Sequence, residues 1–221
     1  MKEMITSFDA CPLGVYLDCL AIADDASRED IDKQVAILAL LSGLHERDIL
    51  NLPIAEYKAM AAAADFLQHP ARKVGRPAAK YTLGDFTLIP TQDLRKVTAA
   101  QYIDFQTFAP EGDARLVELL SVLLVPEGHA YSDGYDPLDV QASIRGELRV
   151  TDALALVAFF FKSWVKLTRA TLASLEREIR SAAKIKDPAK RRELLTRIAT
   201  TKADLTRSLR DVGDGYKRLT S

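Results

Sequence analysis

The amino-acid sequence predicts a mainly α-helical fold, in which two small helical units are joined by a β-hairpin and followed by a C-terminal antiparallel helical hairpin. Apolar residues recur at spacings of three and four along most of the 221 residues. Only one segment, residues 81–89, places a two-residue turn signal between β-prone flanks. Hydrophobic residues make up 48% of the chain, which is enough to bury a sizeable core.

Residues 1–69 are expected to form the first helical unit. A helix begins near Pro12 and ends at the acidic pair 24–25. Ser27, followed three residues later by Asp30, resembles a capping box and is expected to open the next helix, which the pair 42–43 closes. Two further helices follow, over residues 46–50 and from residue 53 to about residue 67.

Residues 70–97 are expected to form a basic linker and a β-hairpin. Residues 69–80 contain two prolines, a glycine and four Lys or Arg, and they show no apolar period, which is typical of a linker. The pair Gly84–Asp85 then predicts the two-residue turn of a hairpin. Because an isolated hairpin is marginally stable in water, we expect it to pack on the helices.

Residues 98–161 are expected to form the second helical unit. Thr98 and Gln101 predict a capping box at the start of its first helix. An apolar helix is expected over residues 116–125, and residues 126–146 are expected to form a loop with a short helix. Thr151 is the expected N-cap of a long helix that continues to about residue 186.

Residues 162–221 are expected to form a basic helical hairpin. The pair Asp187–Pro188 ends the long helix and starts the last one, which we expect Gly213 to end. This segment contains 16 Lys and Arg against 7 Asp and Glu, a net charge of +9, whereas residues 1–161 contain 14 against 24, a net charge of −10. The difference indicates two surfaces that suit different partners, or each other.

An internal duplication is predicted from the order of the segments. Residues 12–67 align with residues 98–161, and Tyr16-Leu17-Asp18 then falls on Tyr102-Ile103-Asp104 near the start of a helix. The alternative is that two unrelated helical bundles align by their apolar period alone.

No residue pattern predicts an active site, a metal site or a cofactor. His45, His69 and His129 have no second ligand at a metal-binding spacing. Three carboxylates, Asp133, Asp136 and Asp139, could bind a hard cation, but their spacing differs from that of a calcium loop, and Asp136 before Pro137 is better explained as a helix cap.

The remaining polar candidates also have structural explanations. Asp18 and Asp104 could be paired acids, but one carboxylate early in each of two helices is what helix dipoles favour. Cys11 and Cys19 are expected to be reduced and buried, because a helix between them would hold their Cα atoms about 12 Å apart.

No segment predicts a membrane span or a targeting peptide. The longest apolar stretch, residues 153–161, is nine residues long, which is under half of the ~20 residues that a spanning helix needs. The first nine residues include Glu3 and Asp9 before any long apolar run, so we expect neither a secretory signal nor a transit peptide.

A family resemblance is carried by four segments, which are residues 12–18, 37–44, 49–53 and 98–105. They resemble small helical phage proteins that are encoded among tail genes and called tail assembly chaperones. The resemblance covers residues 10–161, and the basic segment from Lys162 onward has no counterpart in it. It implies a non-enzymatic protein of the host cytoplasm that coats the long, helical tape measure protein while tail tube subunits gather around it.

Two other functions stay open: a structural virion component of the neck, connector or tail end, and an accessory protein that binds nucleic acid through the basic hairpin. The expected partners are other phage proteins, with self-association through the C-terminal hairpin as a further possibility. The apolar stripe of the hairpin either forms its core or stays partly open to receive a partner helix. The candidate partner-binding residues are Tyr16, Asp18, Tyr102, Asp104, Trp164, Leu172, Leu175, Ile179, Leu205 and Leu209.

Overall fold

The computed structural model describes residues 3–69, 75–91 and 93–220, and it confirms the mainly α-helical class. Part of the expected basic linker, residues 70–74, lies outside the described residues. The chain divides into two compact units, and each combines segments that are distant in the sequence. Unit 1 comprises Met1–Pro90 and Leu124–Leu156, and unit 2 comprises Thr91–Leu123 and Val157–Ser221.

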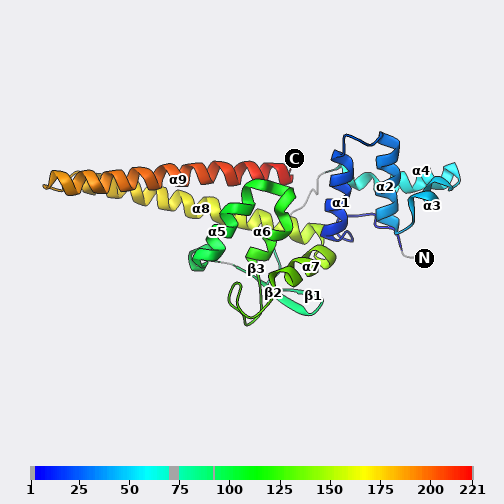
Figure 1. Cartoon of the computed structure of the whole chain (residues 1–221), viewed down its shortest axis with the longest axis horizontal. Helices are drawn as coiled ribbons and strands as arrows, with labels where there is room; N and C mark the ends of the chain where they lie inside the picture. Colours follow the sequence, from blue (N-terminus) through cyan, green and yellow to red (C-terminus); the bar gives the residue numbers. More distant parts are fainter. Residues whose placement is uncertain (1–2, 70–74, 92, 221) are drawn as a thin grey trace. The chain divides into compact units, whose positions relative to one another are not determined.

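Unit 1 contains a helical part and a small sheet (Figure 1). The helices are α1 (Leu13–Asp24), α2 (Asp30–Ser42), α3 (Glu46–Leu50), α4 (Ile54–Ala63), the 3-10 helix η1 (Ala64–Gln68) and α7 (Pro137–Glu147). The strands are β1 (Tyr81–Leu83), β2 (Phe86–Pro90) and β3 (Leu124–Pro126). The long helix α8 (Val150–Ala182) begins in this unit and continues in unit 2.

The N-terminal segment is fixed to the junction of α7 and α8 by backbone contacts. Leu13 N donates to Leu148 O at 2.7 Å, and Val150 N donates to Cys11 O at 3.0 Å. Gly14 permits this approach, since a Cβ there would lie 2.7 Å from the carbonyl oxygen of Arg145. The hydrogen bonds satisfy backbone groups at two helix starts, where intrahelical partners are lacking.

The sheet is antiparallel, with the strand order β1-β2-β3. Leu83 pairs with Phe86, so Gly84–Asp85 forms the two-residue turn that the sequence predicts, and Gly84 has a φ of 54°. The third strand differs from our prediction, which extended the helix over residues 116–125. The helix α6 ends at Leu123, because residues 124–126 pair with β2 instead.

Unit 2 is built around the antiparallel pair formed by α8 and α9 (Pro188–Thr220), which lie side by side (yellow to red in Figure 1). Near one end of the pair the Phe161 and Tyr216 rings stack at 4.1 Å, and farther along Lys202 Nζ lies 3.1 Å from Glu176 Oε1. The remaining elements are η2 (Leu94–Lys96), α5 (Ala99–Phe108), η3 (Ala109–Arg115) and α6 (Leu116–Leu123).

The predicted capping box at the start of α5 is confirmed. Gln101 N donates to Thr98 Oγ1 at 3.2 Å, and Thr98 N donates to Gln101 Oε1 at 3.1 Å. The amide nitrogen of the Gln101 side chain also donates to Val122 O at 3.1 Å, which ties α5 to α6. One buried glutamine therefore satisfies both a helix end and a contact between helices.

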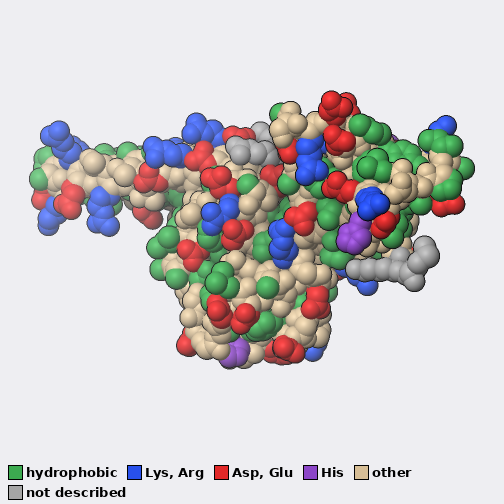
Figure 2. All heavy atoms as spheres, turned by 45° about the vertical axis from the view of Figure 1, so that its right-hand side comes forward, with side chains coloured by type: hydrophobic (Ala, Val, Ile, Leu, Met, Phe, Trp, Pro, Cys, Tyr) green, Lys and Arg blue, Asp and Glu red, His purple; other side chains and the backbone are tan. Residues whose placement is uncertain are grey.

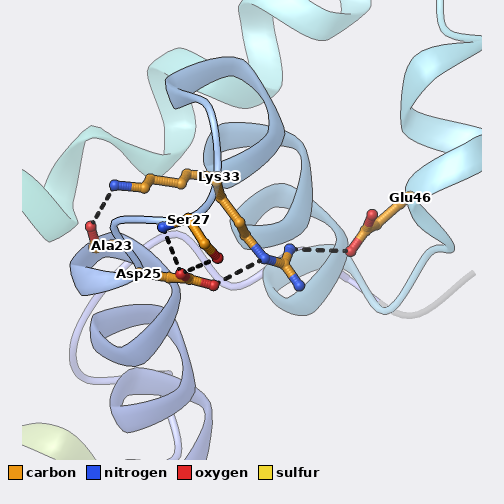
Figure 3. Close-up of polar contacts among 6 residues, drawn as sticks. Ala23, Asp25, Ser27, Lys33 and Glu46 are labelled. Atoms are coloured by element: carbon orange, nitrogen blue, oxygen red, sulfur yellow. Dashed lines mark hydrogen bonds and ion pairs between the residues drawn. The ribbon is translucent and has the colours of Figure 1, made fainter.

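The prediction that Ser27 caps α2 is wrong. Its backbone N and its Oγ both donate to Asp25 Oδ1, at 2.9 and 2.6 Å, and Arg28 bridges Asp25 to Glu46 (Figure 3). The N-cap of α2 is Glu29, which makes no side-chain cap hydrogen bond. The serine forms a local turn with the preceding carboxylate, an alternative that Ser and Asp side chains commonly adopt.

Other helix boundaries also differ from the prediction. Helix α8 ends at Ala182 and not near residue 186, so the pair Asp187–Pro188 lies beyond its end. Helix α8 begins at Val150, one residue before the expected N-cap Thr151, because Arg149 forms a β-bridge with Pro12. Helix α9 does not end at Gly213 but continues to Thr220, because the last turns pack against η3.

The division into units also differs from the one that we expected. Residues 98–161 do not stay together: α5, η3 and α6 belong to unit 2, whereas β3 and α7 belong to unit 1. The internal duplication stays a prediction.

Candidate protein-binding surfaces

The histidines and the acidic loop have local structural partners. His69 Nε2 lies 3.3 Å from Asp65 Oδ2, and His129 Nδ1 lies 3.1 Å from the backbone oxygen of Asp133. Asp136 caps α7, as predicted, because its Oδ1 accepts from Leu138 N at 2.9 Å. Within residues 3–69, 75–91 and 93–220, no three His, Cys, Asp or Glu side chains lie close enough together to hold a metal ion.

The two cysteines are free and buried, as predicted. Burial raises the pKa of the Cys11 thiol to about 11 and that of Cys19 to about 12. Because the thiolate is the reactive form, both groups are poor nucleophiles at neutral pH.

The carboxyls with shifted pKa values lie on separate elements. Hydrogen bonds from Ser27 lower the pKa of Asp25, and those from Arg95 hold the pKa of Asp93 at about 2. Burial raises the pKa of Asp152 at the start of α8. These shifts have local structural causes, and they do not gather the acid and base of a catalytic pair at one site.

An open groove of about 550 Å³ lies between α2 and the segment formed by α4 and η1. Its apolar lining residues are Ala23, Ile31, Ile37, Leu38, Ala61, Ala64 and Leu67. Asp30, Lys33, Gln34 and Gln68 supply polar side chains to the same lining. The buried cluster of Val35, Leu38, Ala39 and Ile49 packs with Tyr57 and Met60 and fixes α2 relative to α4.

One large apolar side chain of the groove lining remains exposed, since Ile31 is 53% exposed. Leu50 of α3 and Ile54 of α4 are 67% and 69% exposed and are not part of the lining. Figure 2 shows hydrophobic side chains interspersed with charged ones over the helices of unit 1. Apolar floors with polar rims are typical of surfaces that bind other polypeptides.

The second candidate surface lies on the hairpin of unit 2. A groove of about 600 Å³ is lined by Ile179, Ala199, Lys202, Ala203, Thr206, Arg207 and Arg210. The seam between the helices is closed, since Ala182 and Ile198 are 1% and 3% exposed. A pair of helices covers only the facing part of each apolar stripe, so residues beside the seam keep part of their surface in solvent.

The electrostatics of the two units are opposite. Unit 1 contains 11 Lys and Arg against 19 Asp and Glu, a net charge of −8, whereas unit 2 contains 19 against 12, a net charge of +7. Figure 2 shows Lys and Arg side chains spaced along α8 and α9.

Comparison of the chain with protein-family models, with curated proteins and with solved structures finds no match. Among the helices that the structure describes, none is both long enough and apolar enough to cross a bilayer.

The predicted partner-binding residues fall in two groups that belong to different units. In unit 1, Tyr16 is half-buried and its ring lies 5.8 Å from that of Phe8, while Asp18 pairs with Arg145 of α7. In unit 2, Tyr102 is 39% exposed and Asp104 is half-buried. The ion pair gives Asp18 a structural role, because it links α1 to α7.

For Trp164 the structure favours the core alternative. Its side chain is only 4% exposed and its ring lies 4.9 Å from that of Phe105 and 5.7 Å from that of Tyr102. The hairpin candidates that keep part of their surface exposed are Leu172, Leu175, Ile179, Leu205 and Leu209. Of these, Ile179 lines the groove of unit 2.

The sequence analysis did not predict Ala199 and Ala203 of the hairpin groove as site residues. Ala199 and Ala203 lie one helical turn apart and leave the hairpin groove open, as Ala61 and Ala64 do in unit 1. The usable signal was small residues at a spacing of three or four beside the predicted apolar stripe, which the search for large apolar residues passed over.

Proposed function

We propose that this chain is a non-enzymatic phage morphogenesis protein, a tail assembly chaperone that binds apolar helical segments of a tape measure protein. The observation that carries the proposal is the open groove between α2 and α4–η1, with its apolar lining and the 53% exposed Ile31. The resemblance of residues 10–161 to tail assembly chaperones suggests the tape measure protein as the partner.

The geometry of the groove suits a helix better than a small molecule. It is open to solvent, and its walls come from helix α2 and from α4 and η1, where alanines leave room for the ridge of a third helix. Small-molecule sites instead bury most of their ligand. The exposed Ile31 side chain would be covered when an amphipathic helix binds, which is favourable by roughly 25 cal/mol per Å² of apolar area.

Co-expression with a fragment of the tape measure protein encoded by the same phage tests the proposal. The expected result is that the fragment is soluble and co-purifies with the tagged chain, and that it aggregates when expressed alone. Ile31→Asp is expected to weaken the complex, because it places a charge on the apolar lining.

Leu138→Asp is the matched control, since Leu138 is 69% exposed on α7 and does not line the groove. A fragment that stays soluble when expressed alone, and that does not co-purify with this chain when the two are co-expressed, would contradict the proposal. Mass spectrometry of purified virions distinguishes a chaperone, which is depleted there, from a structural component, which remains.

The charge of unit 2 supports a second candidate function, in which the hairpin binds nucleic acid. A net charge of +9 over residues 162–221 would make such binding fall steeply with salt. Electrophoretic mobility shifts with duplex and single-stranded DNA at low salt test it, and the absence of any shift would dismiss it.

A further inference from the structure

The hairpin of unit 2 is supported by other helices at one end only. Trp164 of α8 packs on Phe105 of α5, and a Cβ at Gly215 of α9 would lie 3.0 Å from the carbonyl carbon of Ala109 in η3. Thr168 of α8 is still buried at 2%. Beyond it, α8 and α9 extend together past α5 and α6 (Figure 1), and Glu176 forms an ion pair with Lys202.

In this far part of the hairpin the seam is closed but one flank is open. Ile198 is 3% exposed in the seam, whereas Ile179 is half-buried and lines the groove. The α9 wall of the groove is built from Ala199, Ala203 and Thr206. These short side chains lie about one helical turn apart, so the backbone of another helix can come close to α9.

The rim of the groove is basic. Lys202, Arg207 and Arg210 line it, and all three come from α9. Glu176 neutralises Lys202 at 3.1 Å, and Asp211 lies 3.3 Å from Arg210 Nε, but residues 162–221 keep a net charge of +9. A partner that covers this flank must therefore bring negative charge, because like charges at an interface are repelled.

We propose that this flank of α8 and α9 binds an acidic amphipathic helix of a partner protein and forms a three-helix bundle with it. The inference rests on the proposed function, in which the chain acts by binding helical polypeptides, and it adds the site and the charge of the partner. The partner helix carries an apolar stripe that covers Ile179, Ala199 and Ala203, with Asp or Glu beside the stripe that face Lys202 and Arg207.

The observations favour this occupant over the others. The hairpin of a second copy has the same positive charge, so two such flanks repel each other. The described lining of the groove includes no aromatic ring on which a base could stack, and its floor is aliphatic, which does not suit nucleic acid. From Ala199 to Arg210 the groove runs for roughly 16 Å, or three helical turns, which is enough for a short helix.

The test measures binding of two synthetic helical peptides of about 20 residues to the full chain by fluorescence anisotropy. Both peptides carry the same leucine stripe, and one has Glu and the other Lys at the flanking positions. We expect the Glu peptide to bind at least about tenfold more tightly at low salt, and its advantage to shrink at high salt. Equal binding of the two peptides, or tighter binding of the Lys peptide, would overturn the inference.

Two variants test whether the peptide binds at this flank of α8 and α9. Ala203→Phe fills the groove, and Thr201→Phe adds the same ring to an exposed position of α9 that is rotated by about 200° from it. We expect Ala203→Phe to weaken binding of the Glu peptide by about tenfold or more, and Thr201→Phe to leave it unchanged. Circular dichroism checks that both variants keep the helix content of the parent chain. Equal affinities of the two variants would refute the site.

Two further measurements test whether the groove instead binds a second copy of the chain or nucleic acid. Light scattering at low and high salt detects self-association, and an oligomer that Ala203→Phe dissociates would assign the groove to a second copy and overturn the inference. Competition by duplex DNA that displaces the peptide from the parent chain would assign it to nucleic acid, with the same consequence. Peptide binding without co-purification of a tape measure fragment would refute the proposed function alone, whereas co-purification of the fragment by a chain that does not bind the Glu peptide would refute this inference alone.

Discussion

Two glycines of α9 offer a matched test of how closely this helix packs in unit 2. A Cβ at Gly215 would overlap the carbonyl oxygen of Ala109 and would lie 3.1 Å from the Cα of Pro110, so its neighbours are backbone atoms that cannot rotate away. A Cβ at Gly213, in the same helix, meets no atom of the described residues within 4 Å beyond its own neighbours and helix backbone. Gly215→Ala and Gly213→Ala therefore make the same chemical change in opposite surroundings.

The magnitude follows from two terms. Replacing glycine by alanine inside a helix is favourable by about 0.5–1 kcal/mol, through the helix propensity and the entropy of the unfolded chain. Overpacking a closely packed contact costs typically about 1–3 kcal/mol. Because the first term is common to both variants, their difference isolates the contact of α9 with η3. We expect Gly213→Ala to be more stable than Gly215→Ala by about 1–3 kcal/mol.

The assay is urea unfolding followed by the fluorescence of Trp164, the single tryptophan of the chain, which lies buried in unit 2. Each kcal/mol corresponds to roughly 2–4 °C in the thermal midpoint for a chain of 150–250 residues, so thermal unfolding gives an independent check. Equal stability of the two variants, or a gain for Gly215→Ala, would refute the close packing of α9 on η3.

Four further predictions concern the capping box, the buried thiols and the core. Thr98→Ala is expected to destabilise unit 2 by about 1 kcal/mol in urea unfolding, because it removes the acceptor for Gln101 N, and Thr98→Ser should retain most of that stability. The thiols of Cys11 and Cys19 are expected to react with an alkylating agent at pH 8 only after unfolding in urea; rapid reaction of the folded chain would contradict their burial. The folded pKa values of the two thiols, about 11 and 12, exceed the ordinary value of 9.0, so the folded state binds more protons above pH 9. The contribution of the two thiols to the unfolding free energy should therefore be constant from neutral pH to pH 9, and the unfolding free energy measured by urea titration should fall between pH 9 and 12. Phe160→Ala, at a side chain 1% exposed, is expected to cost about 3–5 kcal/mol by the same assay, and a loss below 1 kcal/mol would mean that this ring is not core.

The features predicted well from the sequence depend on neighbours along the chain. The capping box of Thr98 and Gln101, the turn at Gly84–Asp85 and the cap of α7 by Asp136 each need residues within three positions of each other. Competition between nearby side chains for the same hydrogen bond limits even these local predictions. Ser27 has the spacing of a cap, but the carboxylate of Asp25 is nearer and accepts its hydrogen bonds.

The features that were missed depend on partners distant in the sequence. Strand β3 lies in an apolar run whose period does not distinguish a helix from a buried strand, and only pairing with β2 decides it. The same pairing places residues 124–126 in unit 1, although they directly follow α6 of unit 2 in the sequence. A linear division at residues 69, 97 and 161 could not anticipate such interleaved units.

The predicted partner-binding residues lie only in part at the grooves, and their binding of a partner stays a prediction. The apolar stripe of the hairpin was recognised, and Ile179 does line a groove there. Trp164 was included because it is large and apolar, but such residues also fill the core, and burial decides between the two. Alanines leave a groove open because their side chains are short, so a pattern of large apolar residues does not reveal them.

The central claim is that the open helical flanks of this chain bind another helical polypeptide. Hydrogen–deuterium exchange of the full chain, alone and with a tape measure fragment that it keeps in solution, tests this most directly. The account predicts slower exchange of backbone amides over residues 30–38 and 61–68, which border the groove of unit 1, and over residues 199–210 for an acidic partner helix. Unchanged exchange over all three segments in a complex that is demonstrably formed would contradict it.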